Sequence, residues 1–362
     1  MIAAALDSVV SIATVASAAD PASPTVPDAD PAPLLVPDEY IFDALPEFWF
    51  ALVLGTLAAY VALDGFDFGV GMWYATREDE EEREQFLAAF GPVWDANEVW
   101  LVAFGTTLLG AFPAAYAALL SDHYLLALGA VVALIFRGIA PELREQREDE
   151  RWRRACDRLF VAGSTLSPLL LGTLVGSWVF GTGTLSLPAI LTGVGLIALS
   201  LTTGAGYLAI KTEGDLRAAM TRNGQFATVG YLAGVVVLLT VLFALDPRGI
   251  TSDLQSVPML AIVVGSVVLG IGGIALARME RHREWFASTL GLAVLLGLFV
   301  AVLLYPEVYP ATDLTVSEAI VSPIALNLMT ILGLPVLVLV GGYFVYLYSV
   351  FGGTVESEGY GG

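Results

Sequence analysis

The sequence is poor in the residues that bind metals and form disulfides. Its 362 residues include one cysteine, Cys156, and two histidines, His123 and His282, both in predicted loops. A single cysteine forms no internal disulfide and cannot supply a metal site built on several thiolates. Two loop histidines cannot provide the axial ligands of several haem groups. From these residues we expect no metal or haem site in this chain.

Charged residues are also scarce, at 14% of the chain, whereas a soluble protein of this length carries about 25%. Hydrophobic residues make up 57%, and they form runs of about 20 residues, the length that a bilayer core requires. The charges that remain are mostly acidic, with a formal net charge of −20, which disfavours nucleic acid as a partner. The composition therefore predicts a multi-pass protein of the cell membrane.

The first 45 residues differ from the rest of the chain. Residues 1–19 are moderately apolar but lack a basic start, and Ala16-Ser17-Ala18 resembles a small-residue cleavage site. Residues 21–37 are rich in Pro, Ala and Asp and predict an extended segment. Both a cleaved signal and a plain flexible tail fit this pattern. The predicted organisation is an acidic extracytoplasmic tail (1–45), a transmembrane domain (46–350) and a short cytoplasmic tail rich in Gly and Glu (351–362).

Hydropathy and helix breakers predict an all-α fold with about nine transmembrane helices. The predicted spans are residues 47–75, 92–117, 121–140, 158–180, 186–210, 224–245, 257–277, 286–305 and 323–349. All but one of the 16 basic residues lie in or beside the loops that follow the first, third, fifth and seventh spans. Because cytoplasmic loops are enriched in Lys and Arg, the N-terminus is predicted outside and the C-terminus in the cytoplasm. The exception, Arg248, is predicted on the outer side.

Carboxylates are concentrated near the predicted inner ends of the first spans. Asp64 and Asp67 lie three residues apart in the first span, and Asp95 and Glu98 repeat this spacing at the start of the second. Residues three apart share one face of a helix. Because short acidic side chains are costly within a bilayer, we expect them to face the protein interior and to find partners there.

Other residues of these spans complete a candidate polar cluster. Arg137, near the end of the third span, is the expected counter-ion for one of the aspartates, while Trp94 adjoins Asp95 and Asp157 begins the fourth span. A series of carboxylates can relay protons, because each can bind and release one near its neighbour. The same side chains can instead form an ion-pair lock between helices, or lie as ordinary charges in the headgroup region. The sequence leaves these interpretations open.

Two motifs in these spans resemble signatures of subunit II of the cytochrome bd quinol oxidases. Leu63-Asp64-Gly65-Phe66-Asp67-Phe68-Gly69-Val70-Gly71 is similar to the first-helix signature of that family. Gly91-Pro92-Val93-Trp94-Asp95-Ala96-Asn97-Glu98-Val99-Trp100-Leu101 is similar to the second-helix signature. The order and number of spans agree over about residues 47–350. Ala96 and Gly138 depart from the usual pattern of the family, and the second departure leaves the local shape after Arg137 in doubt.

The resemblance implies a subunit of a terminal oxidase that oxidises quinol and reduces dioxygen to water with protons from the cytoplasm. It implies a homologous partner, subunit I, that binds two haems of type b and one of type d, while this chain binds none. It also implies two four-helix groups plus one peripheral helix. Family positions tied to haem integrity or proton uptake correspond to Asp64, Asp67, Trp94, Asp95, Arg137 and Asp157.

Two other functions remain open from the sequence. One is an ion- or proton-coupled transporter that uses Asp64, Asp67 and Asp95, and the other is a purely structural anchor of subunit I. Transporters usually have interrupted helices near the midplane in both halves of the chain. Here the polar motifs lie only in the first half and toward one end of the spans, which disfavours the transporter.

Overall fold

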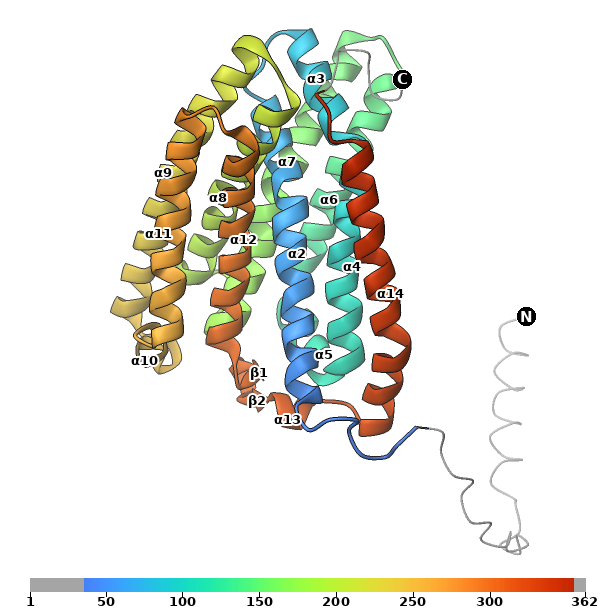
Figure 1. Ribbon diagram of the computed structural model, residues 1–362, viewed down its shortest axis with the longest axis vertical. Helices are drawn as coiled ribbons and strands as arrows, with labels where there is room; N and C mark the ends of the chain where they lie inside the picture. The colour runs from blue at the N-terminus through green and yellow to red at the C-terminus, as the bar shows by residue number, and fades with distance from the viewer. Residues whose placement is uncertain (1–35, 355–362) are drawn as a thin grey trace, which may run out of the picture.

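The helices of the protein run along one axis and form an elongated bundle (Figure 1). The computed structural model describes residues 36–354, so the signal-like start, most of the acidic N-terminal tail and the last residues of the C-terminal tail lie outside the described residues. The long helices are α2 (Leu45–Tyr74), α4 (Trp94–Ala111), α6 (Tyr124–Glu145), α7 (Glu150–Phe180), α8 (Leu187–Lys211), α9 (Gly214–Leu245), α11 (Val257–Arg278), α12 (His282–Leu304) and α14 (Pro323–Val350).

Short elements close the two ends of this bundle. They are α3 (Glu80–Phe90), α5 (Pro113–Asp122), η1 (Pro247–Gly249), α10 (Thr251–Leu254), β1 (Glu307–Tyr309), η2 (Pro310–Thr312), β2 (Leu314–Thr315) and α13 (Val316–Ala319). The two strands pair as a small antiparallel hairpin. Within the described residues, every long element is therefore helical, as the sequence predicts.

Eight helices of the described chain are long and apolar enough to cross a membrane. The predicted span 92–117 is the one that differs, because it is divided into α4 and α5 at Phe112, the residue before a proline. Asp95, Asn97 and Glu98 also make the start of α4 polar. With 18 residues, α4 is about 27 Å long, and it packs beside α2 and α14 (Figure 1). The polytopic helical fold agrees with the prediction. Nine spans are reached only when the polar helix α4 is counted with the eight apolar helices.

The long helices form two groups and one peripheral helix. α2, α4, α6 and α7 pack together, as do α8, α9, α11 and α12, and α2 also contacts α8 and α12 of the second group. α14 lies outside both groups against α4, and much of its surface remains exposed. This arrangement agrees with the architecture that the family resemblance implies.

The two groups approach closely where α2 crosses α8. A Cβ atom at Gly204 would lie 2.5 Å from the Cα of Gly69, and one at Gly69 would collide with the carbonyl oxygen of Ser200. Glycines at both positions therefore allow the two backbones to touch, as small residues do between membrane helices. Because Gly69 follows Asp67 by two residues, this crossing fixes the part of α2 that carries the acidic motif.

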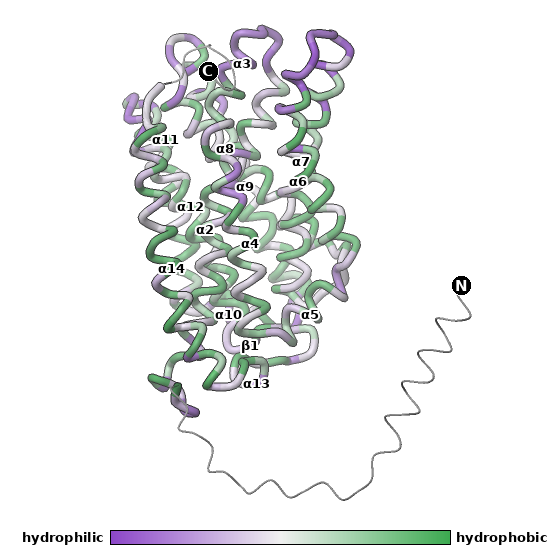
Figure 2. The backbone as a smooth tube through the Cα atoms, turned by 90° about the vertical axis from the view of Figure 1, so that its right-hand side faces the viewer, coloured by the Kyte–Doolittle hydropathy of each residue, from purple (hydrophilic) through white to green (hydrophobic). Residues whose placement is uncertain are grey.

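The two ends of the bundle differ in charge. The loops that join α2 to α3, α6 to α7, α8 to α9 and α11 to α12 lie at one end with the end of α14, and Figure 2 shows their hydrophilic residues there. The start of α2 and the β-hairpin lie at the opposite end. Arg248 is also there, where it donates to the carbonyl oxygen of Val179 and pairs with Glu307. The basic residues are thus separated as predicted, while the assignment of their end to the cytoplasm stays a prediction.

Candidate functional site

Arg137 on α6 is a fully buried arginine that joins three helices of the first group. Its exposed fraction is 0%, its Nη1 lies 2.5 Å from Oδ1 of Asp64 on α2, and its Nη2 lies 2.9 Å from Oε2 of Glu98 on α4. A buried charge is tolerated in a protein interior only when such partners surround it. The predicted pairing of Arg137 with an aspartate is present, and Glu98 is its second partner.

Aromatic rings enclose the Arg137 guanidinium. Its Cζ lies 4.6 Å from the ring centroid of Phe68, 5.9 Å from that of Phe90 and 6.0 Å from that of Trp94. Such rings attract a cation through the negative potential of their faces. Gly138 leaves room for this arrangement, because a Cβ there would lie 2.9 Å from the Trp94 ring. Gly138, which departs from the usual family pattern, therefore allows the Trp94 ring to pack against α6.

Asp67 lies one turn beyond Asp64 on α2 and has a different partner. It is 0% exposed and accepts a hydrogen bond of 2.8 Å from Nδ2 of Asn97 on α4. The Oδ1 of Asn97 accepts a second bond of 2.7 Å from the hydroxyl of Tyr348 on α14. Sequence reasoning missed both Asn97 and Tyr348, although an asparagine inside the second motif is a polar group within a span and was a signal for it.

The side chains of Asp64, Asp67, Asn97, Glu98 and Arg137 together are called the buried cluster below. Three of them are carboxylates, and the cluster contains one guanidinium. Oδ1 of Asp67 has no hydrogen-bond partner among the described residues. If all three carboxylates were ionised, the excess negative charge would be costly in this low dielectric. The arrangement therefore suits groups that exchange protons.

Asp95 does not join the buried cluster, so the expectation that it faces the interior is wrong. Its side chain is exposed and lines a groove between α4 and α6, together with Glu98 and Glu142. The inward face of α4 is set by Asn97, and Asp95 precedes this residue by two positions, about 200° around the helix. Only Glu98, whose side chain is 27% exposed, belongs to both the groove and the buried cluster.

Asp157 on α7 belongs to a separate group near the arginine-rich end. Its Oδ1 accepts hydrogen bonds of 2.6 Å from the Tyr74 hydroxyl and 2.9 Å from Nε of Arg144, and its Oδ2 lies 3.5 Å from Nη1 of Arg83. Arg144 also pairs with Glu80 at the start of α3. We call these five side chains the interfacial cluster. Asp157 is thus held by protein partners, so it is not a free charge among headgroups.

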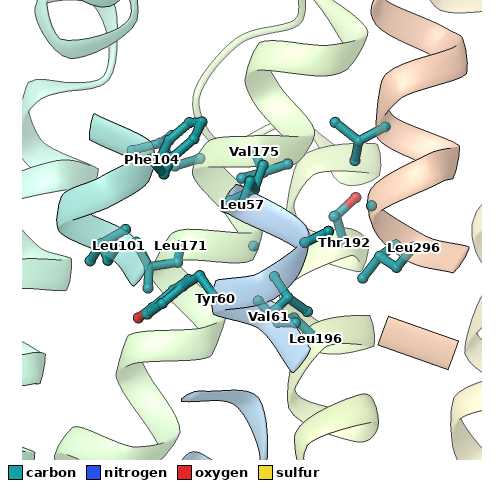
Figure 3. A pocket seen from close by; sticks show the side chains of 15 residues that line it. Leu57, Tyr60, Val61, Leu101, Phe104, Leu171, Val175, Thr192, Leu196 and Leu296 are labelled. Atoms are coloured by element: carbon teal, nitrogen blue, oxygen red, sulfur yellow. The ribbon is translucent and has the colours of Figure 1, made fainter. Parts of the chain in front are cut away.

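An apolar cavity lies between α2, α4, α7, α8 and α12 (Figure 3). Its volume is about 70 Å³, and among its lining residues only Tyr60 and Thr192 carry polar side-chain atoms. Tyr60 precedes Asp64 by one turn of α2 and is buried. Beyond Tyr60, the cavity therefore offers few polar groups for a path toward the far end.

The described residues contain no group of three or more His, Cys, Asp or Glu side chains placed to hold a metal ion. His123 and His282 lie at opposite ends of the bundle, beyond α5 and at the start of α12. Neither histidine belongs to the buried cluster or the interfacial cluster.

Comparisons with known proteins agree with the motifs and the fold. The chain matches the family described as cytochrome bd terminal oxidase subunit II over residues 45–351. It is 30% identical over 331 residues to the cytochrome bd ubiquinol oxidase subunit 2 of Bacillus subtilis (strain 168), covering 85% of this chain and 96% of that protein. It is 28% identical over 369 residues to the cytochrome bd-I ubiquinol oxidase subunit 2 of Escherichia coli (strain K12), covering 88% and 97%.

A solved structure has the same fold. The structure of bd oxidase from Geobacillus thermodenitrificans matches with a TM-score of 0.67 at 17% identity, covering 85% of this chain and 99% of the matched chain. Because the sequence match spans all the long helices and both acidic motifs, the chain belongs to the cytochrome bd terminal oxidase subunit II family.

Proposed function

We propose that this chain, as subunit II of a cytochrome bd-type quinol oxidase in the cell membrane, carries protons toward its partner subunit. The partner is subunit I, which forms a heterodimer with this chain and holds the haems of type b and type d. Quinol oxidation and dioxygen reduction take place in that subunit. Reduction of dioxygen to water consumes protons, so the complex needs a polar route through its apolar interior.

The observation that carries this proposal is the continuity of the buried cluster. Glu98 reaches the groove between α4 and α6, Arg137 links it to Asp64, and both of these inner residues are fully buried. The carboxylates bind and release the protons, whereas the arginine stays charged and holds them in place. The chain of contacts therefore leads from the interior of α2 to the side of the bundle.

A buried serine lies between this route and the arginine-rich end of the bundle. Ser164 on α7 is fully buried, its hydroxyl has no hydrogen-bond partner among the described residues, and it lies against Gly71 of α2. Gly71 stands between Asp67 and Tyr74, so Ser164 lies between the two clusters. Ordered water commonly satisfies buried polar groups of this kind. We infer that protons enter at the interfacial cluster and pass Ser164 to the buried cluster.

The groove between α4 and α6 is the proposed exit and the face that meets subunit I. Asp95, Glu98 and Glu142 all line it, within an otherwise apolar wall. A carboxylate that faces lipid costs up to about 3 kcal/mol, whereas a protein partner can offer hydrogen bonds. Trp94 forms one end of this groove and also contacts Arg137, so it is proposed to separate the groove from the arginine.

The second candidate is a purely structural role, in which the buried cluster locks α2, α4 and α6 together under subunit I. The two ion pairs of Arg137 favour it, because each joins a different helix to α6. Such a lock needs no proton transfer. Replacing a carboxylate with an amide of the same shape therefore distinguishes the two functions, through its effect on turnover and on haem content.

The test replaces one carboxylate at a time in the intact oxidase complex. We expect Asp67→Asn and Glu98→Gln each to lower quinol oxidase turnover about tenfold or more, with haem content unchanged, because an amide cannot relay a proton. Glu213→Gln is the matched control, since Glu213 is an exposed carboxylate before α9 that lies outside both clusters and the groove. Full turnover in both variants would exclude the proton role, and loss of haem together with turnover would favour the lock.

A further inference from the structure

A basic pocket lies at the arginine-rich end of the second helix group, away from both clusters. It is lined by Arg217 near the start of α9 and by Arg281, His282 and Arg283 where α11 turns into α12. One wall is formed by Gly352–Thr354, and the pocket volume is about 590 Å³. Such a concentration of basic residues is unusual in a chain with a net charge of −20.

Not all of this positive charge is neutralised within the pocket. Arg281 pairs with Glu284 at 2.8 Å, and Glu280 is the only other carboxylate among the described lining residues. Arg283 makes no ion pair with the described part of the chain. Arg217 also has a partner, because its Nη2 lies 4.0 Å from Oε1 of Glu213, an exposed carboxylate that does not line the pocket. Arg283 therefore keeps its positive charge available to a ligand in the pocket.

The start of α12 adds hydrogen-bond donors to the pocket. This helix has 23 residues, and its N-cap Arg281 provides no side-chain cap. The first N–H groups of a helix have no intrahelical acceptor, and they carry partial positive charge. In addition, Nδ1 of His282 is shielded from solvent and has no hydrogen-bond partner among the described residues. The free backbone N–H groups of α12 therefore lie beside the arginines, together with Nδ1 of His282, which donates in one tautomer of the neutral ring.

The opposite wall of the pocket is apolar and firmly held. Ala209 and Ile210, at the end of α8, line it. The adjoining Lys211 is 5% exposed and donates to the carbonyl oxygens of Phe351 and Gly353, which fixes the chain segment that forms the side of the pocket. A polar anionic group and a short apolar stem would both find matching surfaces here.

We propose that this pocket binds a phosphate group, supplied by the headgroup of an anionic phospholipid in the adjoining leaflet. The arginines and the start of α12 match the chemistry of a phosphate, and the apolar wall matches the glycerol and first methylene groups. Basic pockets between helix ends on the cytoplasmic side are suited to such headgroups. A soluble molecule that carries a phosphate shares this chemistry and is distinguished by the experiment.

The experiment measures ligand retention on the intact oxidase complex in detergent by native mass spectrometry. The probes are phosphatidylglycerol, zwitterionic phosphatidylcholine and inorganic phosphate, each titrated separately. We expect phosphatidylglycerol to bind in preference to phosphatidylcholine. The double variant Arg217→Gln/Arg283→Gln is expected to weaken its binding about 25-fold, at about fivefold for each arginine near a membrane surface.

Arg222→Gln is the matched control, because Arg222 is an exposed arginine of α9 that does not line the pocket. Its affinity for phosphatidylglycerol is expected to equal that of the unchanged complex, and unaltered haem content and melting temperature verify that each variant is folded. Binding of inorganic phosphate alone, lost in the double variant, would support a phosphate site with a soluble ligand.

Equal retention of phosphatidylglycerol by the double variant and the control would overturn the proposal. So would binding that appears only after residues 355–362 are deleted, because Glu356 and Glu358 of that segment would then be the occupants of the pocket.

Discussion

The buried cluster and the interfacial cluster share one arrangement of ion pairs but differ in the exposure of their carboxylates. In each, an arginine of α6 pairs with two carboxylates from other elements. The side chains of Arg137 and Asp64 are 0% exposed, whereas Glu80, which pairs with Arg144, is 47% exposed. Charges without water interact strongly and tolerate no missing partner, while charges at the surface share their stabilisation with solvent. The same pairing therefore has different consequences at the two depths.

The largest effect is expected from Arg137→Gln. Removing the guanidinium would leave Asp64 and Glu98 without their counter-ion, and breaking a buried pair costs about 3–5 kcal/mol. We expect a large fall in the melting temperature of the oxidase complex and loss of bound haem. The exposed Arg222→Gln serves as the control. A melting temperature close to that of the unchanged complex would mean that the two clusters do not differ as their burial indicates.

A smaller effect is expected from Arg144→Gln in the interfacial cluster. Its partners Asp157 and Glu80 keep contact with solvent and with other arginines, so we expect a loss of about 1–2 kcal/mol. Salt should reduce the difference between this variant and the unchanged complex, because the charge of the exposed partner Glu80 is screened. The melting temperature measured at low and high salt tests this, and an equal salt effect on Arg137→Gln would remove the distinction.

The smallest effect is expected from Tyr348→Phe, which removes one neutral hydrogen bond between the buried cluster and α14. The Tyr348 hydroxyl donates to Oδ1 of Asn97, and loss of such a bond costs about 1 kcal/mol. We expect faster amide hydrogen exchange in α14, with little change in α2. Tyr346→Phe, at an exposed position of the same helix, is the control. Faster exchange in α2 would mean that α14 supports the whole cluster.

Much of this site was predictable because its residues carry a local pattern. Asp64 and Asp67 were expected to share one helix face from their spacing and to face inward, and Arg137 was expected as the counter-ion of one of the aspartates. These predictions rest on the high cost of an unpaired charge in a bilayer. That cost acts on each residue separately, so it can be read from the sequence.

The tertiary contacts of these residues were harder to predict from the sequence. Arg137 and Asp64 are 73 positions apart, and Tyr348 and Asn97 are 251 apart. Asp95 and Glu98 are three residues apart, so both were expected on one inward face of the helix. Instead, α4 is rotated so that Asn97 faces inward and Asp95 faces the groove. The break between α4 and α5 also lay within one predicted span. Rotation and contact of this kind depend on the neighbouring helices, which the local pattern does not contain.

The sequence by itself determined that the chain is a polytopic helical membrane protein with its basic residues at one end and its acidic motifs in the first helices. The thickness of the bilayer, hydropathy and the cost of burying charge act on short segments, so their effects can be predicted from the sequence. Only the tertiary structure decided that the carboxylates divide into two clusters at different depths. That division arises because packing, at contacts such as Gly69 with Gly204, sets which faces of distant helices meet.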